Sequence, residues 1–146
     1  MPEPGISASL RRQVYARAQG CCEYCRSQER FAPDTFSVEH TIAHARGGET
    51  DAYNLALACQ GCNNHKYDKT EAVDPATGLV VPLFNPRRAP WDAHFVWSAD
   101  YALVIGITPS GRATVQALAL NRPGVVYLRR VLHQLGDHPP RKPAAD

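Results

Sequence analysis

Hydrophobic residues recur at helical spacing ahead of the first cysteine. Leu10 and Val14 share one face of a predicted helix that continues to Ala18. Ser7 or Ser9 can cap its first turn, because a serine hydroxyl accepts a hydrogen bond from an otherwise free backbone N–H there. We therefore expect an amphipathic helix in this segment.

The next stretches fit two strands, of which the first alternates between hydrophobic and polar positions. Residues 36–40 (FSVEH) fit one strand and residues 55–58 (LALA) fit a return strand. Between them, residues 42–54 contain two adjacent glycines and read as a compact loop. Residues 61–69 then follow as a helix. The pattern predicts a long-looped hairpin followed directly by a helix.

The middle of the chain is rich in proline and less regular. Residues 71–90 carry four of the twelve prolines, which predicts an irregular segment that wraps around the core. Residues 94–97 and 102–107 form a second predicted hairpin that turns between them. This half of the chain is thus expected to begin with little regular structure and then to form two short strands.

Two helices are predicted after the second hairpin. Thr108 as cap and Pro109 at the first helical position favour a helix start, and the helix is expected to run through Leu120. Asn121 is expected to cap a last helix over residues 123–134. The fold class that follows is α+β.

Length and composition indicate one small domain. The chain has 146 residues, 44% hydrophobic and 21% charged, which is enough for one modest core. We expect a core at residues 1–70, an extension at 71–136 packed on it, and a frayed tail at 137–146. No apolar run reaches the roughly 18–20 residues of a membrane span. No signal peptide is apparent, so a cytoplasmic protein without a membrane partner is expected.

The five cysteines gather in the first half of the chain and are spaced as metal ligands. Cys22 and Cys25 form one C-x-x-C pair, and Cys59 and Cys62 form a second after 33 residues. Two such pairs can complete the closed tetrahedral thiolate shell that structural zinc prefers. Cys21 also fits a ligand spacing with Cys25, but the spacing of Cys22 equals that of the second pair. We predict a structural zinc site that performs no chemistry.

Residues between and after the two pairs suggest phosphodiester hydrolysis. Such a reaction needs a base for water and a divalent cation for the phosphate charge. His40 at a strand end suits the base, since imidazole titrates near neutral pH. Glu39 and Asn63 offer oxygen ligands to the cation, and Lys66, one turn beyond Asn63, can contact a phosphate. Net charge, only +2, gives weak support for a nucleic-acid partner.

In this order the motifs resemble the HNH endonuclease family, in the subset with two zinc knuckles. The shared pattern, C-x-x-C, acid-His, Gly-Gly, Asn-Leu and C-x-x-C-N-x-x-K, covers residues 22–66. The resemblance implies a ββα-metal core stapled by zinc, with a C-terminal hairpin and two helices. It implies DNA as substrate, Mg²⁺ or Mn²⁺ bound by Glu39 and Asn63, His40 as general base, and Asn54 as the residue that holds the loop and orients His40. Residues 82–130 also look like the tail of a bacterial subfamily.

The chain departs from the family pattern at three places. Glu39 stands where aspartate is commoner, so the metal ligand is one methylene longer. Ala43 replaces the usual proline after the base, and His65 lies where many members carry another residue. His44 and His65 could each contact metal or DNA, but both also fit ordinary loop or helix-surface positions. His94 fits a cluster of aromatic residues better than a ligand role.

Three functions remain open at this stage. The main hypothesis is a metal-dependent DNA endonuclease. A catalytically inactive DNA-binding zinc module is the second, and a structural zinc domain that recruits proteins is the third. Glu39, His40, Asn54 and Asn63 together favour the enzyme, because a binding module needs no such set. Arg87 and Arg88 could hold phosphates, although an ion-paired or solvated pair fits equally well.

Overall fold

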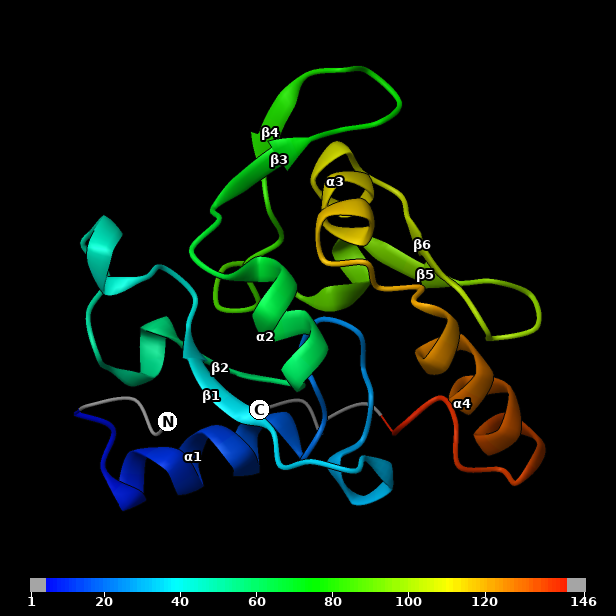
Figure 1. The fold of residues 1–146 in the computed structure, drawn as a ribbon, viewed down its shortest axis with the longest axis horizontal. Coiled ribbons are helices and arrows are strands. Elements are labelled where there is room, and N and C mark those ends of the chain that lie inside the picture. Colours follow the sequence, from blue (N-terminus) through cyan, green and yellow to red (C-terminus); the bar gives the residue numbers. More distant parts are fainter. Residues whose placement is uncertain (1–4, 142–146) are drawn as a thin grey trace.

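The computed structural model describes residues 5–141 (Figure 1). It is a small mixed α/β fold, with four α-helices and short antiparallel strands in three two-stranded sheets across the described residues. No helix in this part of the chain is long and apolar enough to cross a membrane. The three sheets are not joined to one another by strand pairing, so packing of helices and of buried side chains holds the fold together.

The first helix, α1, spans Ala8–Ala18 and confirms the predicted amphipathic helix. It starts two residues earlier than expected, and Ser7 is its cap, since its side chain accepts a hydrogen bond from the Leu10 N–H. Within the helix, the Val14 side chain is fully buried. α1 therefore packs an apolar face on β2 and leaves Arg12 exposed, whereas Arg17 donates to the Ala52 and Leu55 carbonyls.

The predicted long-looped hairpin and its following helix are present. β1 (Ser37–His40) pairs antiparallel with β2 (Leu55–Ala58), with Glu39 opposite Ala56 and His40 opposite Leu55. Every residue of β2 is buried. The following helix, α2, spans Gln60–Lys66. Its predicted end at residue 69 is wrong, because Tyr67 adopts a positive φ of 50° that ends the helix.

The predicted irregular wrap contains a hairpin that the sequence pattern missed. β3 (Glu71–Val73) pairs with β4 (Val80–Pro82). In the turn between them, the Asp74 N–H donates to the Leu79 carbonyl and the Gly78 N–H donates to the Asp74 carbonyl. Both strands are only three residues long and mostly exposed. Because neither face is buried, no hydrophobic alternation marks these strands in the sequence.

The second predicted hairpin and the helix after it are also present. β5 (Phe95–Trp97) pairs with β6 (Val104–Gly106), and α3 spans Pro109–Ala117. The Thr108 hydroxyl accepts a hydrogen bond from the Gly111 N–H, as a cap does. The helix ends three residues before the predicted Leu120. β6 lies so close to α3 that a Cβ at Gly106 would sit 2.4 Å from the Arg112 nitrogen.

The last helix, α4, spans Pro123–Gln134 as predicted, but its cap differs. Asn121 does not cap it. The Asn121 side chain instead bonds both backbone groups of Val104 and accepts a hydrogen bond from Arg129. Asn121 thus joins β6 to the helix pair, and the helix starts at proline, which needs no cap for its missing N–H.

Residues 137 and 138, which we expected to belong to a frayed tail at 137–146, are packed against the rest of the fold. The Asp137 carbonyl accepts a hydrogen bond from Gln28, and His138 is 6% exposed with its Nε2 bonded to the Tyr101 carbonyl. Residues 142–146 of that prediction lie outside the described residues. The chain is therefore packed at least through His138.

One hydrophobic cluster contains residues from both halves of the chain. The members from the first half surround β2 and the cysteines, and those from the second half come from the segments on either side of α3. Its largest fully buried side chains include Tyr24, Leu55, Leu57, Phe95 and Leu118. The extension therefore shares a core with the hairpin and α2, and it fixes the surroundings of both candidate sites.

Candidate functional site

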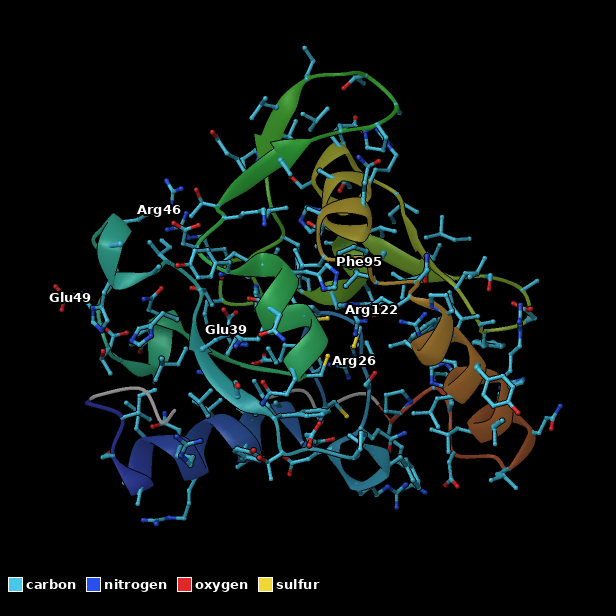
Figure 2. The ribbon with its side chains drawn as sticks, viewed as in Figure 1. Arg26, Glu39, Arg46, Glu49, Phe95 and Arg122 are labelled. Carbon is cyan, nitrogen blue, oxygen red and sulfur yellow. The ribbon has the colours of Figure 1, made fainter. Side chains whose placement is uncertain are left out.

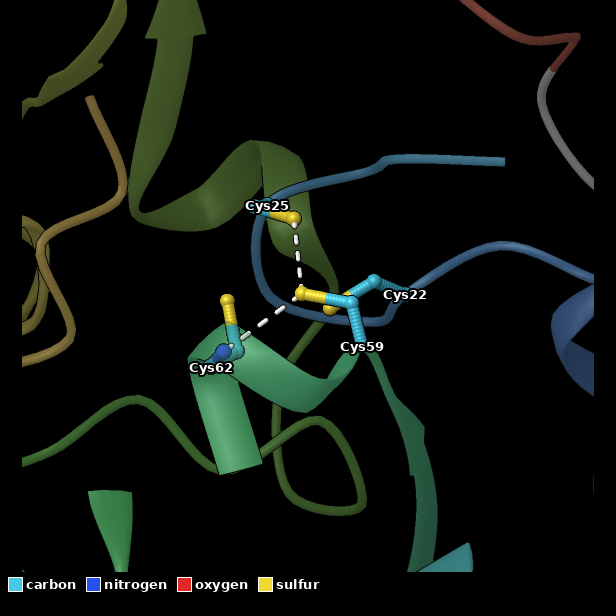
Figure 3. Close-up of side chains that lie close together, drawn as sticks. All are labelled: Cys22, Cys25, Cys59 and Cys62. Carbon is cyan, nitrogen blue, oxygen red and sulfur yellow. Dashed lines mark hydrogen bonds between the residues drawn. The ribbon is translucent and has the colours of Figure 1, made fainter. Parts of the chain in front are cut away.

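The four cysteines of the two C-x-x-C pairs meet in the interior. Their sulfur atoms all lie within 4.8 Å of one another, and all four residues are buried (Figure 3). Cys22 and Cys25 come from the turn after α1. Cys59 is the N-cap of α2, and Cys62 lies in its first turn. This arrangement is placed to bind one metal ion, and a four-thiolate donor set is the one that structural zinc prefers.

The structure decides between Cys21 and Cys22. Cys21 lies outside the cluster, and its thiol donates to the Gln19 carbonyl at 3.6 Å. Burial raises the pKa of the Cys21 thiol. Cys21 is therefore a buried structural thiol, whereas Cys22 faces the other three sulfurs.

Each of the four thiols affects the pKa of the others. Burial raises the pKa of Cys22, whereas hydrogen bonds from Cys22 and the other thiols lower the pKa of Cys25. Cys25 Sγ lies 3.6 Å from Cys59 Sγ. Sulfurs at this distance cannot all ionise in the interior unless a cation offsets their charge. The cluster thus requires either shared protons or a bound metal.

Arg122, from the turn between α3 and α4, contacts the cluster from outside and was missed by the sequence analysis. Its Nη1 lies 3.7 Å from Cys62 Sγ and its Nη2 lies 3.5 Å from Cys59 Sγ. Burial alone would lower the pKa of Arg122, but the nearby cysteines raise it overall. A Cβ at Gly61 would meet the guanidinium at 2.7 Å, so this glycine makes room for it. No spacing rule links positions 60 residues apart.

Glu39 lies on the other side of α2 from Arg122 in the view of Figure 2. Its side chain is 3% exposed, and Tyr24 donates a short hydrogen bond to its Oε1. Lys66 Nζ lies 3.2 Å from its Oε2. Burial raises the pKa of Glu39, which the Lys66 charge and the Tyr24 hydroxyl partly oppose. The carboxylate therefore already has a cationic partner within the protein.

Lys66 is turned inward. It is 3% exposed, and its Nζ also donates to the backbone carbonyls of His40 and Thr41 at 3.3 and 3.0 Å. The phosphate contact that we expected of this lysine stays a prediction. Its burial supports another role, in which the ammonium holds Glu39 and the end of β1 in place.

His40 is 6% exposed and faces the loop after β1. Its Nε2 lies 2.8 Å from Thr50 Oγ1, and His44 Nε2 lies 2.9 Å from the same oxygen. The two imidazole rings are 4.3 Å apart. A hydroxyl has one proton, so Thr50 cannot donate to both rings and at least one Nε2 must donate. The sequence analysis did not find Thr50, because a lone threonine in a loop carries no signal.

Asn54 ties the two ends of the loop together. Its Oδ1 accepts from the Thr41 hydroxyl and from the Ile42 N–H at 2.7 and 2.9 Å. Its Nδ2 donates to the carbonyls of Ile42 and Glu49 at 2.9 and 2.8 Å. Gly48 packs so closely here that a Cβ would lie 1.6 Å from the Ile42 carbonyl oxygen. The amide thus fixes the backbone that directly follows His40.

The remaining predicted residues have distinct surroundings. Asn63 is half-buried on α2, between Cys62 and Lys66 in sequence. His65 is exposed, and its Nδ1 bonds the Gly61 carbonyl at 2.8 Å. His94 bonds the Thr108 hydroxyl and packs near Phe84 and Phe95, as the aromatic-cluster interpretation expects. A carboxylate and an amide oxygen are donors that suit a hard divalent cation.

Comparison with known proteins adds an independent observation. The family model described as HNH endonuclease matches residues 22–69, which include both cysteine pairs, β1, β2 and α2. Searches of curated proteins and of solved structures returned no match. Over residues 22–69 the chain thus matches the HNH endonuclease family.

Proposed function

We propose that the protein is an endonuclease that hydrolyses DNA phosphodiester bonds with the help of one divalent metal ion. The observation that carries this proposal is the family match over residues 22–69 together with the local structure, in which β1, β2 and α2 carry Glu39, His40 and Asn63. The four-cysteine cluster braces this unit, and we assign it a structural zinc ion. Both C-x-x-C pairs are used, so no ligand position is left for chemistry there.

Each residue has one proposed task. Glu39 and Asn63 hold Mg²⁺ or Mn²⁺, which when bound supplies positive charge for the phosphate and the leaving oxygen. His40 accepts a proton from a water molecule whose oxygen attacks phosphorus. The P–O3′ bond breaks, and the leaving oxygen takes a proton from solvent water, which gives a 3′-hydroxyl and a 5′-phosphate. Asn54 keeps His40 in place by fixing the backbone after it, through its contacts with Thr41 and Ile42.

Lys66 has a different task in this proposal from the one we first expected. Its ammonium holds a positive charge beside Glu39, which keeps the carboxylate oriented in a buried position. A divalent ion at Glu39 would compete with this ammonium for the same oxygen. Such competition accounts for a cation site that binds its metal weakly and reversibly.

The Glu39–Lys66 pair also favours the second candidate, a DNA-binding zinc module without catalysis. A carboxylate that is permanently neutralised by lysine needs no metal. The two candidates differ in one measurable property, since only the enzyme nicks supercoiled plasmid after Mg²⁺ or Mn²⁺ is added.

The deciding experiment is a plasmid-nicking assay on the purified protein and three variants. His40→Ala should lose about 10²–10⁴-fold in turnover, which is the usual contribution of a general base. Glu39→Ala should lose activity through weaker metal binding, so high Mn²⁺ should restore part of it but should not restore His40→Ala. His133→Ala is the matched control, because His133 is an exposed histidine on α4, outside the family match, and this variant should cut normally.

Two results would contradict this assignment. Nicking by His40→Ala at the wild-type rate would place the active site elsewhere. A wild-type protein that binds DNA but never cuts it, with either metal, would leave the inactive zinc module as the function.

A further inference from the structure

Arg87 and Arg88 are neighbours in the sequence but differ in burial and in their contacts. Arg87 is largely buried and forms an ion pair with Glu23, so it is used inside the fold. Arg88 is exposed, and it lines a cavity of about 240 Å³ between α2 and the segment that follows β4. The sequence could not distinguish the two. The structure leaves Arg88 available to a ligand.

The charged side chains that line this cavity are all basic. Lys66, Lys69 and Arg88 line it, and no carboxylate does so among the described residues. Lys66 is neutralised by Glu39, but Lys69 is exposed and its Nζ donates only to a backbone carbonyl, that of His65. Two positive charges therefore remain. The larger cavity of the molecule, about 1000 Å³, contrasts with it, because Glu23 and Asp92 outnumber Arg26 in its lining.

The uncharged polar groups of the smaller cavity also suit an anion. Asn85 and Thr41 line it, and the Asn85 amide lies 3.4 Å from the Thr41 hydroxyl. The Thr41 hydroxyl already donates to Asn54, so the second N–H of the Asn85 amide is the uncharged donor for a phosphate oxygen, a contact typical of protein–DNA complexes. A concave site with one sign of charge concentrates ligands of the opposite sign.

The position of the cavity relates it to the proposed active site. Thr41, which lines it, directly follows His40, and Lys66 reaches it from the Glu39 side. The cavity thus borders the end of β1, where Lys66 donates to the carbonyls of His40 and Thr41. The residues on the other wall, Asn85 and Arg88, come from the extension beyond the family match.

We propose that this cavity binds a backbone phosphate of the DNA next to the one that is cut, and that Arg88 and Lys69 are its cationic contacts. The extension thereby supplies a part of the DNA-binding surface that the HNH segment lacks. This inference rests on the proposed function for the identity of the substrate. The binding chemistry itself does not depend on cleavage.

The test measures binding of duplex DNA in the His40→Ala background, so that the DNA stays intact. Fluorescence anisotropy at 50–200 mM salt should give a log–log salt slope that falls by about 1 for Arg88→Ala and by about 1 for Lys69→Ala. The change in Kd across this range should then shrink about fourfold for each lost contact. Arg130→Ala removes the same charge from an exposed position on α4 that does not line the cavity, and its slope should not change.

A second arm uses inorganic phosphate as the probe. Titration of the wild-type chain, followed through the NMR signal of the Arg88 Nε–H, should give a saturable shift that Lys69→Ala weakens. Equal salt slopes for the Arg88→Ala/Lys69→Ala double variant and for Arg130→Ala would overturn the proposal. Saturable binding of inorganic phosphate with an unchanged DNA slope would also overturn it, because the pocket would then take free phosphate only.

The outcome is separable from the nuclease proposal. If the wild-type protein fails to nick plasmid but the double variant shows the smaller slope, the phosphate site stands and the catalytic assignment falls. If the wild-type protein nicks plasmid and the salt slope of the double variant is unchanged, the catalytic assignment stands and the phosphate site falls.

Discussion

The four-cysteine cluster and the Glu39–His40 region both include side chains from α2, yet their polar atoms are paired in different ways. Four sulfurs face one another in the interior, Arg122 contacts two of them from the edge, and the buried Arg129 donates to the Cys25 carbonyl. At the second site, one carboxylate already contacts an ammonium and a hydroxyl. The cysteine cluster needs a bound cation or shared protons to offset the charge of its sulfurs. Glu39 already has the Lys66 ammonium as its cation.

Under the proposed function, this difference would let one short helix contribute to a tightly held metal site and to an exchangeable one. Soft thiolates in a closed shell bind zinc tightly, and the binding energy appears as folding energy. Two oxygen donors with an internal lysine nearby form an open site of low affinity. The following predictions test whether the two regions differ in this way.

The largest effect is expected from breaking the cysteine cluster. Cys62→Ser should lose zinc and unfold the segment around α2, since structural zinc in small modules contributes roughly 10–16 kcal/mol of apparent binding energy. Metal analysis and circular dichroism measure both outcomes. Cys21→Ser is the matched control, because Cys21 is equally buried but outside the cluster, and it should keep one zinc per chain. Full zinc content and an unchanged Tm in Cys62→Ser would refute the assignment.

The second effect is expected from the buried ion pair. Lys66→Met leaves the Glu39 charge buried without a partner and should cost about 3–5 kcal/mol in urea unfolding. The double variant Glu39→Gln/Lys66→Met buries no charge and should recover most of this loss. Mn²⁺ should raise the Tm of Lys66→Met more than that of the wild type, because the ion then has no competitor. Equal stability of Lys66→Met and wild type would mean that Glu39 is not held by this lysine.

A smaller effect is expected from the arginine that contacts the cysteines. Arg122→Gln should weaken zinc affinity about 10–100-fold, as is usual when a partner of metal ligands is lost. Zinc transfer to a coloured chelator should be correspondingly faster, and the sulfur–cobalt absorption of the cobalt-substituted protein should shift. Arg130→Gln, an exposed arginine of α4, should change neither quantity. If the two variants release zinc at the same rate, Arg122 only packs against the cluster.

The smallest effect on stability is expected from removing the loosely bound metal. Brief EDTA treatment should abolish cutting, and Mg²⁺ or Mn²⁺ should restore it. The free energy of unfolding should change by only about 0.4 kcal/mol at a metal concentration equal to its Kd. Zinc content, measured in parallel, should stay constant. Activity that survives removal of all loosely bound metal would exclude the one-metal mechanism.

Much of the fold followed from local pattern. α1, the β1–β2 hairpin, the β5–β6 hairpin and the starts of α3 and α4 were all predicted, because each has a buried face or a strong start signal. The β3–β4 hairpin was missed because its strands expose both faces. The end of α2 was misplaced because the backbone turns at Tyr67, a residue type with no stop signal.

The sequence by itself determined the donor types of both candidate sites and, through the two equal C-x-x-C spacings, favoured Cys22 over Cys21. It could do so because metal-ligand spacing within a turn is a local property. Only the tertiary structure placed Arg122 beside the sulfurs, turned Lys66 toward Glu39 and separated Arg87 from Arg88. Those outcomes depend on contacts between residues tens of positions apart, where burial and charge compensation decide which partner each side chain takes.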